Sequence, residues 1–284
     1  MSLVGHTVGN FQLVTKIGQG GMGAVYLAHH PTIGRQVAIK VMRRQTAGDN
    51  DHMAERFFGE ARAVNEISHP HIVEIFDCGR EGDRLYLTME YLQGENLADR
   101  IARRPVAIAE ALHVALQVCD ALSASHSRGI IHRDLKPEDI FLLRRGGDEN
   151  FVKVLDFGLA RMPPKLKAYQ TAIDEVFGAP AYMSPEQCEG AGRVDARSDV
   201  YALGLVLFEM LTGRMAFEDK TAMETMLSQM MVAVRRDTSW LMEVYSRIQG
   251  RSAAPSRILT SKNDYRRAFR SSQKLGWRTE CGIR

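Results

Sequence analysis

The side chains best suited to chemistry lie in one short polar run, HRDLKPEDIFL, at residues 132–142. Five charged side chains and a proline precede an abrupt change to apolar residues. Two carboxylates, Asp134 and Asp139, lie on either side of Lys136, and Asp156 opens the later motif DFG. Carboxylate oxygens bind hard cations such as Mg²⁺, and a lysine supplies a compact positive charge. The run therefore indicates a functional site, in which the role of Asp139 is the main question.

A glycine-rich segment, GQGGMG, joins two strand-like runs at residues 11–17 and 24–30. A dinucleotide-binding turn would lead into a helix, and a Walker A loop would need Gly-Lys followed by Ser or Thr. Here a second strand follows, so the segment predicts a hairpin. Its backbone N–H groups can lie over phosphates, because glycine permits close approach. For these glycines alone, a tight turn without a ligand is the alternative.

Lys40 lies in the apolar strand-like run QVAIKVM at 36–42, and Glu60 lies in the helical segment that follows. A lysine in an apolar strand needs a partner, because burying a lone charge is costly. We expect Lys40 to form an ion pair with Glu60. This pair would position the Lys40 ammonium to bind the α- and β-phosphates of a nucleotide. Taken singly, each residue would be interpreted as a solvated surface charge.

The elements that must position these residues change in type along the chain. Strand-like runs predominate up to residue 92, and apolar residues at helical spacing between Ala54 and Ile67 predict one helix among them. Helices predominate from the GEN sequence at 94–96 onward, with a hinge expected near Glu90–Gly94. One long helix ending near Gly129 is expected to carry an apolar face made of Leu112, Ala115, Leu116, Cys119 and Leu122.

The motifs HRDLKPED, DFG at 156–158 and SPE at 184–186 together resemble those of eukaryotic-type protein kinases. The segments GGMGAVY and YMSPEQ are most similar to those of bacterial serine/threonine kinases. The resemblance covers roughly residues 10–220 and implies an α+β, two-lobed protein-kinase fold with ATP in the cleft. It implies an N-lobe at 1–92, with an antiparallel sheet and one helix, and a mainly helical C-lobe at 93–234.

The resemblance also implies a role for each matching residue. Asp134 resembles the catalytic base that accepts the substrate's hydroxyl proton. Lys136 resembles the cation that steadies the γ-phosphate, and its presence favours serine/threonine over tyrosine specificity. Asp139 and Asp156 resemble the ligands of Mg²⁺, with Mn²⁺ as an alternative ion. The remaining positions implied for ATP binding are Gly18, Gly20, Gly23, Val25, Ala38, Lys40, Glu60, Met89 as gatekeeper, Glu90, Leu92 and Phe141.

Two further expectations concern regulation. In the family, an arginine at the position of Arg133 pairs with a phosphorylated activation loop. That loop would run from Asp156 to Glu186, with Thr171 as its best acceptor; a threonine without a role is the alternative. An apolar stack anchored by Asp199 is expected from Val64, Ile75, His132 and Phe157, although simple core packing explains these residues equally well.

Three departures from the family pattern bear on activity. Asp139 stands where the family has Asn, so it adds a negative charge and lacks an NH₂ donor. Ala179 stands where the family usually has Thr, and after about Val234 the family pattern fades. A pseudokinase, a nucleotide-binding scaffold without phosphotransfer, is therefore the alternative. The matching catalytic residues favour the enzyme, a kinase that phosphorylates Ser or Thr of protein substrates and of itself.

Residues 235–284 are predicted to be a divergent basic tail, disordered or derived from a shifted reading frame. They carry ten Arg and two Lys against four acidic residues, a net charge of +8 compared with +3 for the whole chain. Within this tail, Arg267 is a candidate partner for Glu186. Because the tail has this simpler explanation, its charge does not predict specific nucleic-acid binding.

The composition is that of an ordinary globular protein, with 45% hydrophobic and 25% charged residues. The four cysteines form no CxxC pair, as expected for reduced thiols in a cytoplasmic protein. The longest apolar run, VYALGLVLF at 200–208, is too short to span a bilayer and predicts a buried helix. The sequence therefore predicts a cytoplasmic protein without a membrane segment, and it leaves the oligomeric state unknown.

Overall fold

The computed structural model of this chain describes residues 3–20, 23–42, 50–157, 180–189, 194–219 and 221–235. The chain divides into two units, residues 1–235 and 236–284, and every described residue belongs to the first.

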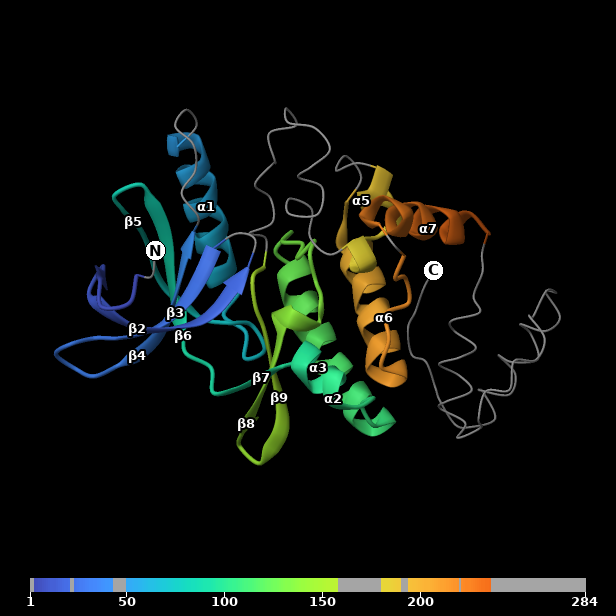
Figure 1. The fold of residues 1–284 in the computed structure, drawn as a ribbon, viewed down its shortest axis with the longest axis horizontal. Helices are drawn as coiled ribbons and strands as arrows, with labels where there is room; N and C mark the ends of the chain where they lie inside the picture. Colours follow the sequence, from blue (N-terminus) through green and yellow to red (C-terminus); the bar gives the residue numbers. More distant parts are fainter. Residues whose placement is uncertain are drawn as a thin grey trace. The chain divides into compact units, whose positions relative to one another are not determined.

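The N-terminal part is an antiparallel sheet with the strand order β1-β2-β3-β4-β6-β5 (Figure 1). Its strands are β1 (Thr7–Val8), β2 (Phe11–Gly20), β3 (Gly23–His29), β4 (Gln36–Met42), β5 (Ile75–Glu81) and β6 (Arg84–Glu90). The glycine segment joins β2 to β3 in register, with Gly20 opposite Gly23, so the predicted hairpin is confirmed. Strand β4 lies between β3 and β6 and is buried from Val37 onward, which places Lys40 in the centre of the sheet.

Helix α1 (Asn50–Asn65) packs against β5 and carries Glu60. Its buried residues include Phe57, Ala61 and Val64, which recur at the helical spacing seen in the sequence. The helix ends at Asn65, before His69-Pro70, where the proline disfavours the helical conformation of His69.

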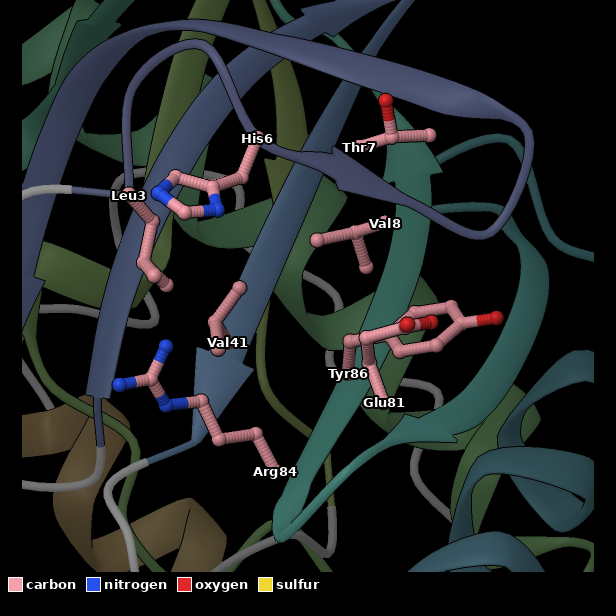
Figure 2. Close-up of a pocket in the computed structure, with 8 residues that line it drawn as sticks. All are labelled: Leu3, His6, Thr7, Val8, Val41, Glu81, Arg84 and Tyr86. Carbon is pink, nitrogen blue, oxygen red and sulfur yellow. The ribbon is translucent and has the colours of Figure 1, made fainter.

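A shallow hollow opens on the face of the N-terminal sheet opposite Lys40 (Figure 2). Val41 lies on its floor, and neighbouring residues of a strand point to opposite faces, so Lys40 points away from it. Its lining consists of Leu3, His6, Thr7, Val8, Val41, Glu81, Arg84 and Tyr86. The hollow is therefore separate from the predicted nucleotide site.

The second part combines helices with a three-stranded sheet in the order β7-β8-β9, in which β8 and β9 follow the first two helices along the chain (Figure 1). The strands are β7 (Gly94–Asn96), β8 (Ile140–Arg145) and β9 (Asp148–Val154). The helices are α2 (Leu97–Arg103), α3 (Ile108–His126), α5 (Pro185–Glu189), α6 (Ala196–Thr212) and α7 (Ala222–Arg235). Two short 3₁₀ turns span Pro137–Asp139 and Pro180–Tyr182.

The buried face of α3 differs from the predicted one. Leu116 is 66% exposed and Cys119 is also exposed, whereas small residues on the neighbouring face are buried. The buried residues are Ala111, Val114, Ala115, Gln117, Val118, Ala121, Leu122 and Ser125. This face packs against β9 and α6, where small side chains allow a close approach. The prediction was therefore right for Ala115 and Leu122, which are buried, and wrong for Leu116 and Cys119.

Helix α6 begins at its N-cap, Asp195, whose side chain accepts a hydrogen bond from the Arg197 N–H. It contacts α3 and is largely buried, as expected for the apolar run at 200–208. Within the part of the chain that the structure describes, no helix has both the length and the apolar character needed to cross a membrane.

Candidate active site

The polar run at 132–142 folds so that three of its charged side chains converge. Pro137 begins the 3₁₀ turn that brings Lys136 and Asp139 onto one side, since its fixed φ suits a helical first position. Lys136 Nζ lies 2.7 Å from Asp134 Oδ2 and 3.9 Å from Asp139 Oδ2. Burial alone would lower the pKa of Lys136, but the carboxylates of Asp139 and Asp134 outweigh it and raise that pKa above its usual value. Lys136 therefore stays charged beside the predicted base.

A second charged pair joins the N-terminal sheet to the segment that follows β9. Lys40 Nζ on β4 lies 2.5 Å from Asp156 Oδ2, and Lys40 is buried. Burial alone would raise the pKa of Asp156, but the ammonium of Lys40 outweighs it and lowers that pKa. Asp156 has a φ of 59°, a left-handed conformation that non-glycine residues rarely adopt. Strain of this kind is typical of functional positions.

Asp139 lies between these two pairs and is 7% exposed. Its carbonyl accepts a 2.8 Å hydrogen bond from the Leu155 N–H, which fixes it beside the segment carrying Asp156. Burial raises the pKa of Asp139 well above its usual range, and Asp156 and Asp134 add to this rise against the opposing effect of Lys136 and Lys40. The charged form of Asp139 is therefore disfavoured by burial and by the two neighbouring carboxylates, and a divalent cation bound beside it would favour that form.

The donor set fits a hard divalent cation, of which Mg²⁺ is an example. Asp139 and Asp156 offer carboxylate oxygens, and Mg²⁺ is usually held by one or two carboxylates, with waters and substrate phosphates completing its shell.

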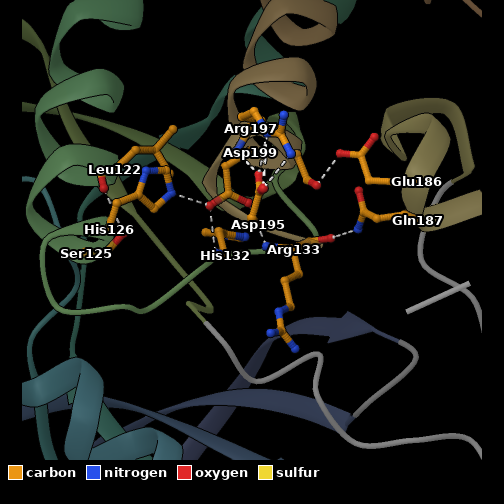
Figure 3. A network of polar contacts seen from close by, with 11 residues as sticks. Leu122, Ser125, His126, His132, Arg133, Glu186, Gln187, Asp195, Arg197 and Asp199 are labelled. Carbon is orange, nitrogen blue, oxygen red and sulfur yellow. Dashed lines mark hydrogen bonds and ion pairs between the residues drawn. The ribbon is translucent and has the colours of Figure 1, made fainter. Parts of the chain in front are cut away.

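A buried carboxylate on α6 sets the backbone of the polar run (Figure 3). The backbone N–H groups of His132 and Arg133 donate to Asp199 Oδ2 and Oδ1, each at 2.8 Å. His126 Nε2 donates to the same Oδ2 at 2.7 Å. These contacts hold Arg133 at a φ of 71°, in the left-handed region. They orient the peptide that leads into Asp134.

The predicted apolar stack is partly visible in the contacts of His132. Its ring lies 4.8 Å from that of Phe157, measured between centroids, and its Nε2 donates to the Leu155 carbonyl at 2.8 Å. Val64 and Ile75 are buried, as the prediction requires.

Three of the positions implied for the adenine site, Val25, Ala38 and Met89, gather at one place. Ala38 and Met89 are buried together with Val73, and Val25 packs against this cluster. Leu92 lies between the end of β6 and the start of β7, where the hinge was expected. Phe141 lies on β8, paired in register with Asn96 of β7.

The surroundings of the hairpin glycines show that glycine is required for packing at one position but not at the others. A Cβ on Gly23 would approach the Val41 carbonyl oxygen to 2.2 Å, so packing against β4 alone requires glycine there. Gly18 has only ordinary contact with Val25, and a Cβ on Gly20 would stand in open space. Packing therefore explains Gly23, whereas Gly18 and Gly20 are consistent with a close approach by a ligand.

The segment at 180–189 is anchored to α6 and α7. Tyr182 donates to Glu209 Oε2 at 2.5 Å, and Gln229 of α7 donates to the carbonyls of Pro180 and Ala181 at 3.1 and 2.9 Å. Glu186, for which Arg267 was the expected partner, accepts a 2.5 Å hydrogen bond from the hydroxyl of Ser198. Arg267, Thr171 and Ala179 lie outside the described residues.

One charged pair was missed by the sequence analysis. Lys153 on β9 is 4% exposed, and its ammonium donates to Glu90 Oε1 at 2.5 Å and to the Ile72 carbonyl at 3.0 Å. Glu90 Oε1 also accepts from the Glu74 N–H at 2.9 Å. The signal was a lysine within an apolar strand, VKV, the same pattern that drew attention to Lys40. For Lys40 itself, pairing with the half-buried Glu60 stays a prediction, since its observed ion pair is with Asp156.

An antiparallel sheet with one helix, joined by a hinge to a mainly helical part that presents a lysine and carboxylates, defines a protein-kinase fold. The chain belongs to the protein kinase domain family, whose pattern matches residues 11–268. The resemblance and the α+β fold class drawn from the sequence are therefore confirmed.

Relatives support this assignment. The chain is 49% identical over 218 residues to the serine/threonine-protein kinase Pkn1 of Myxococcus xanthus, covering 77% of this chain and 31% of that protein. It is 38% identical over 240 residues to PrkC of Bacillus subtilis, covering 84% of this chain and 36% of that protein. It therefore spans about a third of the length of these relatives. The kinase domain of Mycobacterium tuberculosis PknI shares the fold, with a TM-score of 0.60, 24% identity and coverage of 82% of this chain and all of that domain.

Proposed function

We propose that this chain is the catalytic domain of a serine/threonine protein kinase that transfers the γ-phosphate of ATP to proteins, itself included. The observation that carries the proposal is the ion pair between Lys136 and Asp134, 2.7 Å long and adjacent to Asp139. The related proteins Pkn1 and PrkC are named serine/threonine-protein kinases, which supports the choice of acceptor. Pkn1 and PrkC are much longer than this chain, so what they phosphorylate or bind cannot be transferred to it directly. That this chain acts on protein substrates is therefore part of the proposal.

The proposed reaction is a displacement at the γ-phosphorus. The carboxylate of Asp134 accepts the proton of a serine or threonine hydroxyl, the hydroxyl oxygen bonds to the γ-phosphorus, and ADP leaves with the electrons of the broken P–O bond. Lys136 neutralises charge on the transferred group, and Lys40 does so at the α- and β-phosphates. Asp139 and Asp156 would hold Mg²⁺ or Mn²⁺, which supplies further charge neutralisation.

Three finer points extend the proposal. Residues 1–92 would form the N-lobe, 93–234 the C-lobe and 235–284 a separate tail. The reaction would occur in the cytoplasm, where ATP and Mg²⁺ are available, and without specific nucleic-acid binding.

Phosphorylated Thr171 would dock on Arg133. Mass spectrometry of the active protein tests this last point, because an active enzyme without phosphate between residues 156 and 186 would contradict it.

The central experiment uses the full purified chain with labelled ATP and either Mg²⁺ or Mn²⁺. We expect label on serine and threonine after acid hydrolysis, and none on tyrosine. Asp134→Asn is the matched control, since it keeps the shape of the side chain but removes the carboxylate base. ATP binding without any transfer at either metal would favour the pseudokinase alternative, a nucleotide-binding scaffold.

A further inference from the structure

The peptide between Arg133 and Asp134 is held from both of its sides. On the N-terminal side, the Arg133 N–H donates to Asp199, and Arg133 has the left-handed φ of 71°. On the other side, the Arg133 carbonyl accepts a 2.5 Å hydrogen bond from Gln187 Nε2 (Figure 3). That carbonyl belongs to the peptide whose nitrogen is that of Asp134. Gln187 therefore fixes the peptide plane directly before the proposed catalytic base.

The orientation of the Gln187 amide follows from its other contacts. Its Oε1 accepts from the Ser184 N–H at 2.9 Å and from the Ser184 hydroxyl at 3.0 Å. A backbone N–H can only donate, so the atom facing Ser184 must be the oxygen. The atom facing Arg133 is then the NH₂ group, which can only donate to the carbonyl. A single orientation of the amide therefore satisfies its contacts with both Ser184 and Arg133.

A simpler explanation accounts for only half of these contacts. Ser184 and Gln187 form the S-x-x-Q capping box of α5, in which the side chain of the fourth residue bonds back to the N–H of the first. Such a box accepts glutamate as readily as glutamine, because it uses only an oxygen acceptor. The contact with the Arg133 carbonyl needs a donor, which glutamate lacks above its pKa. Capping therefore does not explain why the side chain is an amide.

The segment that carries Gln187 is itself fixed to the helical part. Tyr182 is bonded to Glu209 of α6, and Gln229 of α7 is bonded to the carbonyls of Pro180 and Ala181. The Gln187 amide joins this anchored segment to the backbone of the polar run at 132–142.

We propose that Gln187 is a positioning residue for phosphotransfer. It sets the Arg133–Asp134 peptide, and with it the Asp134 carboxylate, relative to the segment at 180–189. This rests on the proposed kinase function, in which Asp134 is the base. Gln187 itself does not touch the reacting atoms.

The variant Gln187→Glu separates the two explanations. It keeps the acceptor for Ser184 but loses the donor to Arg133, and it sets a carboxylate against the Arg133 carbonyl oxygen. We expect kcat for a peptide substrate to fall about tenfold, because roughly one hydrogen bond that orients Asp134 for the transition state is lost. KM for ATP should stay unchanged. Gln36→Glu, at an exposed position on β4, adds the same charge elsewhere and should leave kcat unchanged. Gln187→Ala loses the cap as well and should also lower Tm.

A second measurement works without activity. Amide hydrogen exchange, followed by mass spectrometry of a peptide covering 132–136, should be faster in Gln187→Glu than in wild type or Gln36→Glu. Exchange over α5 should stay the same, because the capping box is kept. Unchanged kcat together with unchanged exchange would overturn the positioning role. A silent wild type would contradict the kinase function, and exchange alone would then decide whether Gln187 holds the peptide.

Discussion

Lys40 Nζ lies 2.5 Å from Asp156 Oδ2, although 116 positions separate the two residues in the chain. The ammonium expected to bind phosphates and the carboxylate expected to bind metal neutralise one another. In the phosphotransfer arrangement of protein kinases, this lysine serves the phosphates and this aspartate the Mg²⁺. We therefore expect ATP and its metal to give both residues new partners beside this ion pair or in place of it.

Lys40→Met should reduce phosphotransfer by at least about 100-fold, the range seen when one preorganised charge-stabilising donor is removed. The fold should survive, since methionine fills similar space and the Asp156 side chain is 33% exposed. Labelled-ATP assays and thermal melting check the two parts. Lys16→Met, on the exposed part of β2, is the control. Equal activity in Lys40→Met and wild type would show that the nucleotide site is elsewhere.

Asp139→Asn should raise the rate at low Mg²⁺ and matter less at saturating Mg²⁺. The variant keeps an oxygen ligand, but unlike Asp139 it places no negative charge beside Asp134 and Asp156 and has no proton to lose when metal binds. A tenfold gap in rate corresponds to about 1.4 kcal/mol, so even a modest charge effect is measurable. The measurement is a Mg²⁺ titration of autophosphorylation in both proteins. Parallel curves would argue against Asp139 as a ligand.

Lys153→Met should destabilise the fold by about 3 kcal/mol, the lower end for breaking a buried ion pair. The ammonium is buried, and its loss leaves Glu90 without its cation, although the Glu90 side chain keeps 22% exposure. Urea unfolding measures the change in free energy. The double variant Lys153→Met with Glu90→Gln removes the stranded charge and should recover part of the loss. A single variant as stable as wild type would show that the pair contributes nothing.

Glu209→Gln should stabilise the protein more at pH 7.5 than at pH 4.5. Burial raises the pKa of Glu209, although the hydrogen bond from Tyr182 opposes that rise. A carboxyl with a raised folded-state pKa favours folding while protonated, and this contribution is lost as pH rises through that pKa. Glutamine stays neutral at both pH values and can still accept from Tyr182. Equal differences in unfolding free energy at the two pH values would contradict this.

Local patterns were enough to predict the sheet, the hairpin and the motif residues. The hairpin followed from glycines between two strand-like runs, and Lys40 from a charge in an apolar strand. Residues Val25, Ala38 and Met89, placed by the resemblance, do come together. The buried face of α3 could not be predicted from size, because close packing on β9 and α6 selects its small residues. The network around Asp199 involves His132 and Arg133, which lie 67 and 66 positions earlier in the chain. No local sequence pattern encodes contacts over such a separation.

The dependence on Asp199 also bears on the order of folding. Its carboxylate holds the N–H groups of His132 and Arg133, yet it follows them in the chain by 67 and 66 positions. During synthesis, the ribosome therefore releases every charged residue of the run at 132–142 long before the anchor that shapes it. Because forming such distant contacts requires closing a long loop, they form late. We therefore expect a nascent chain that has not yet reached α6 to contain the side chains proposed for catalysis without the carboxylate that holds their backbone in place.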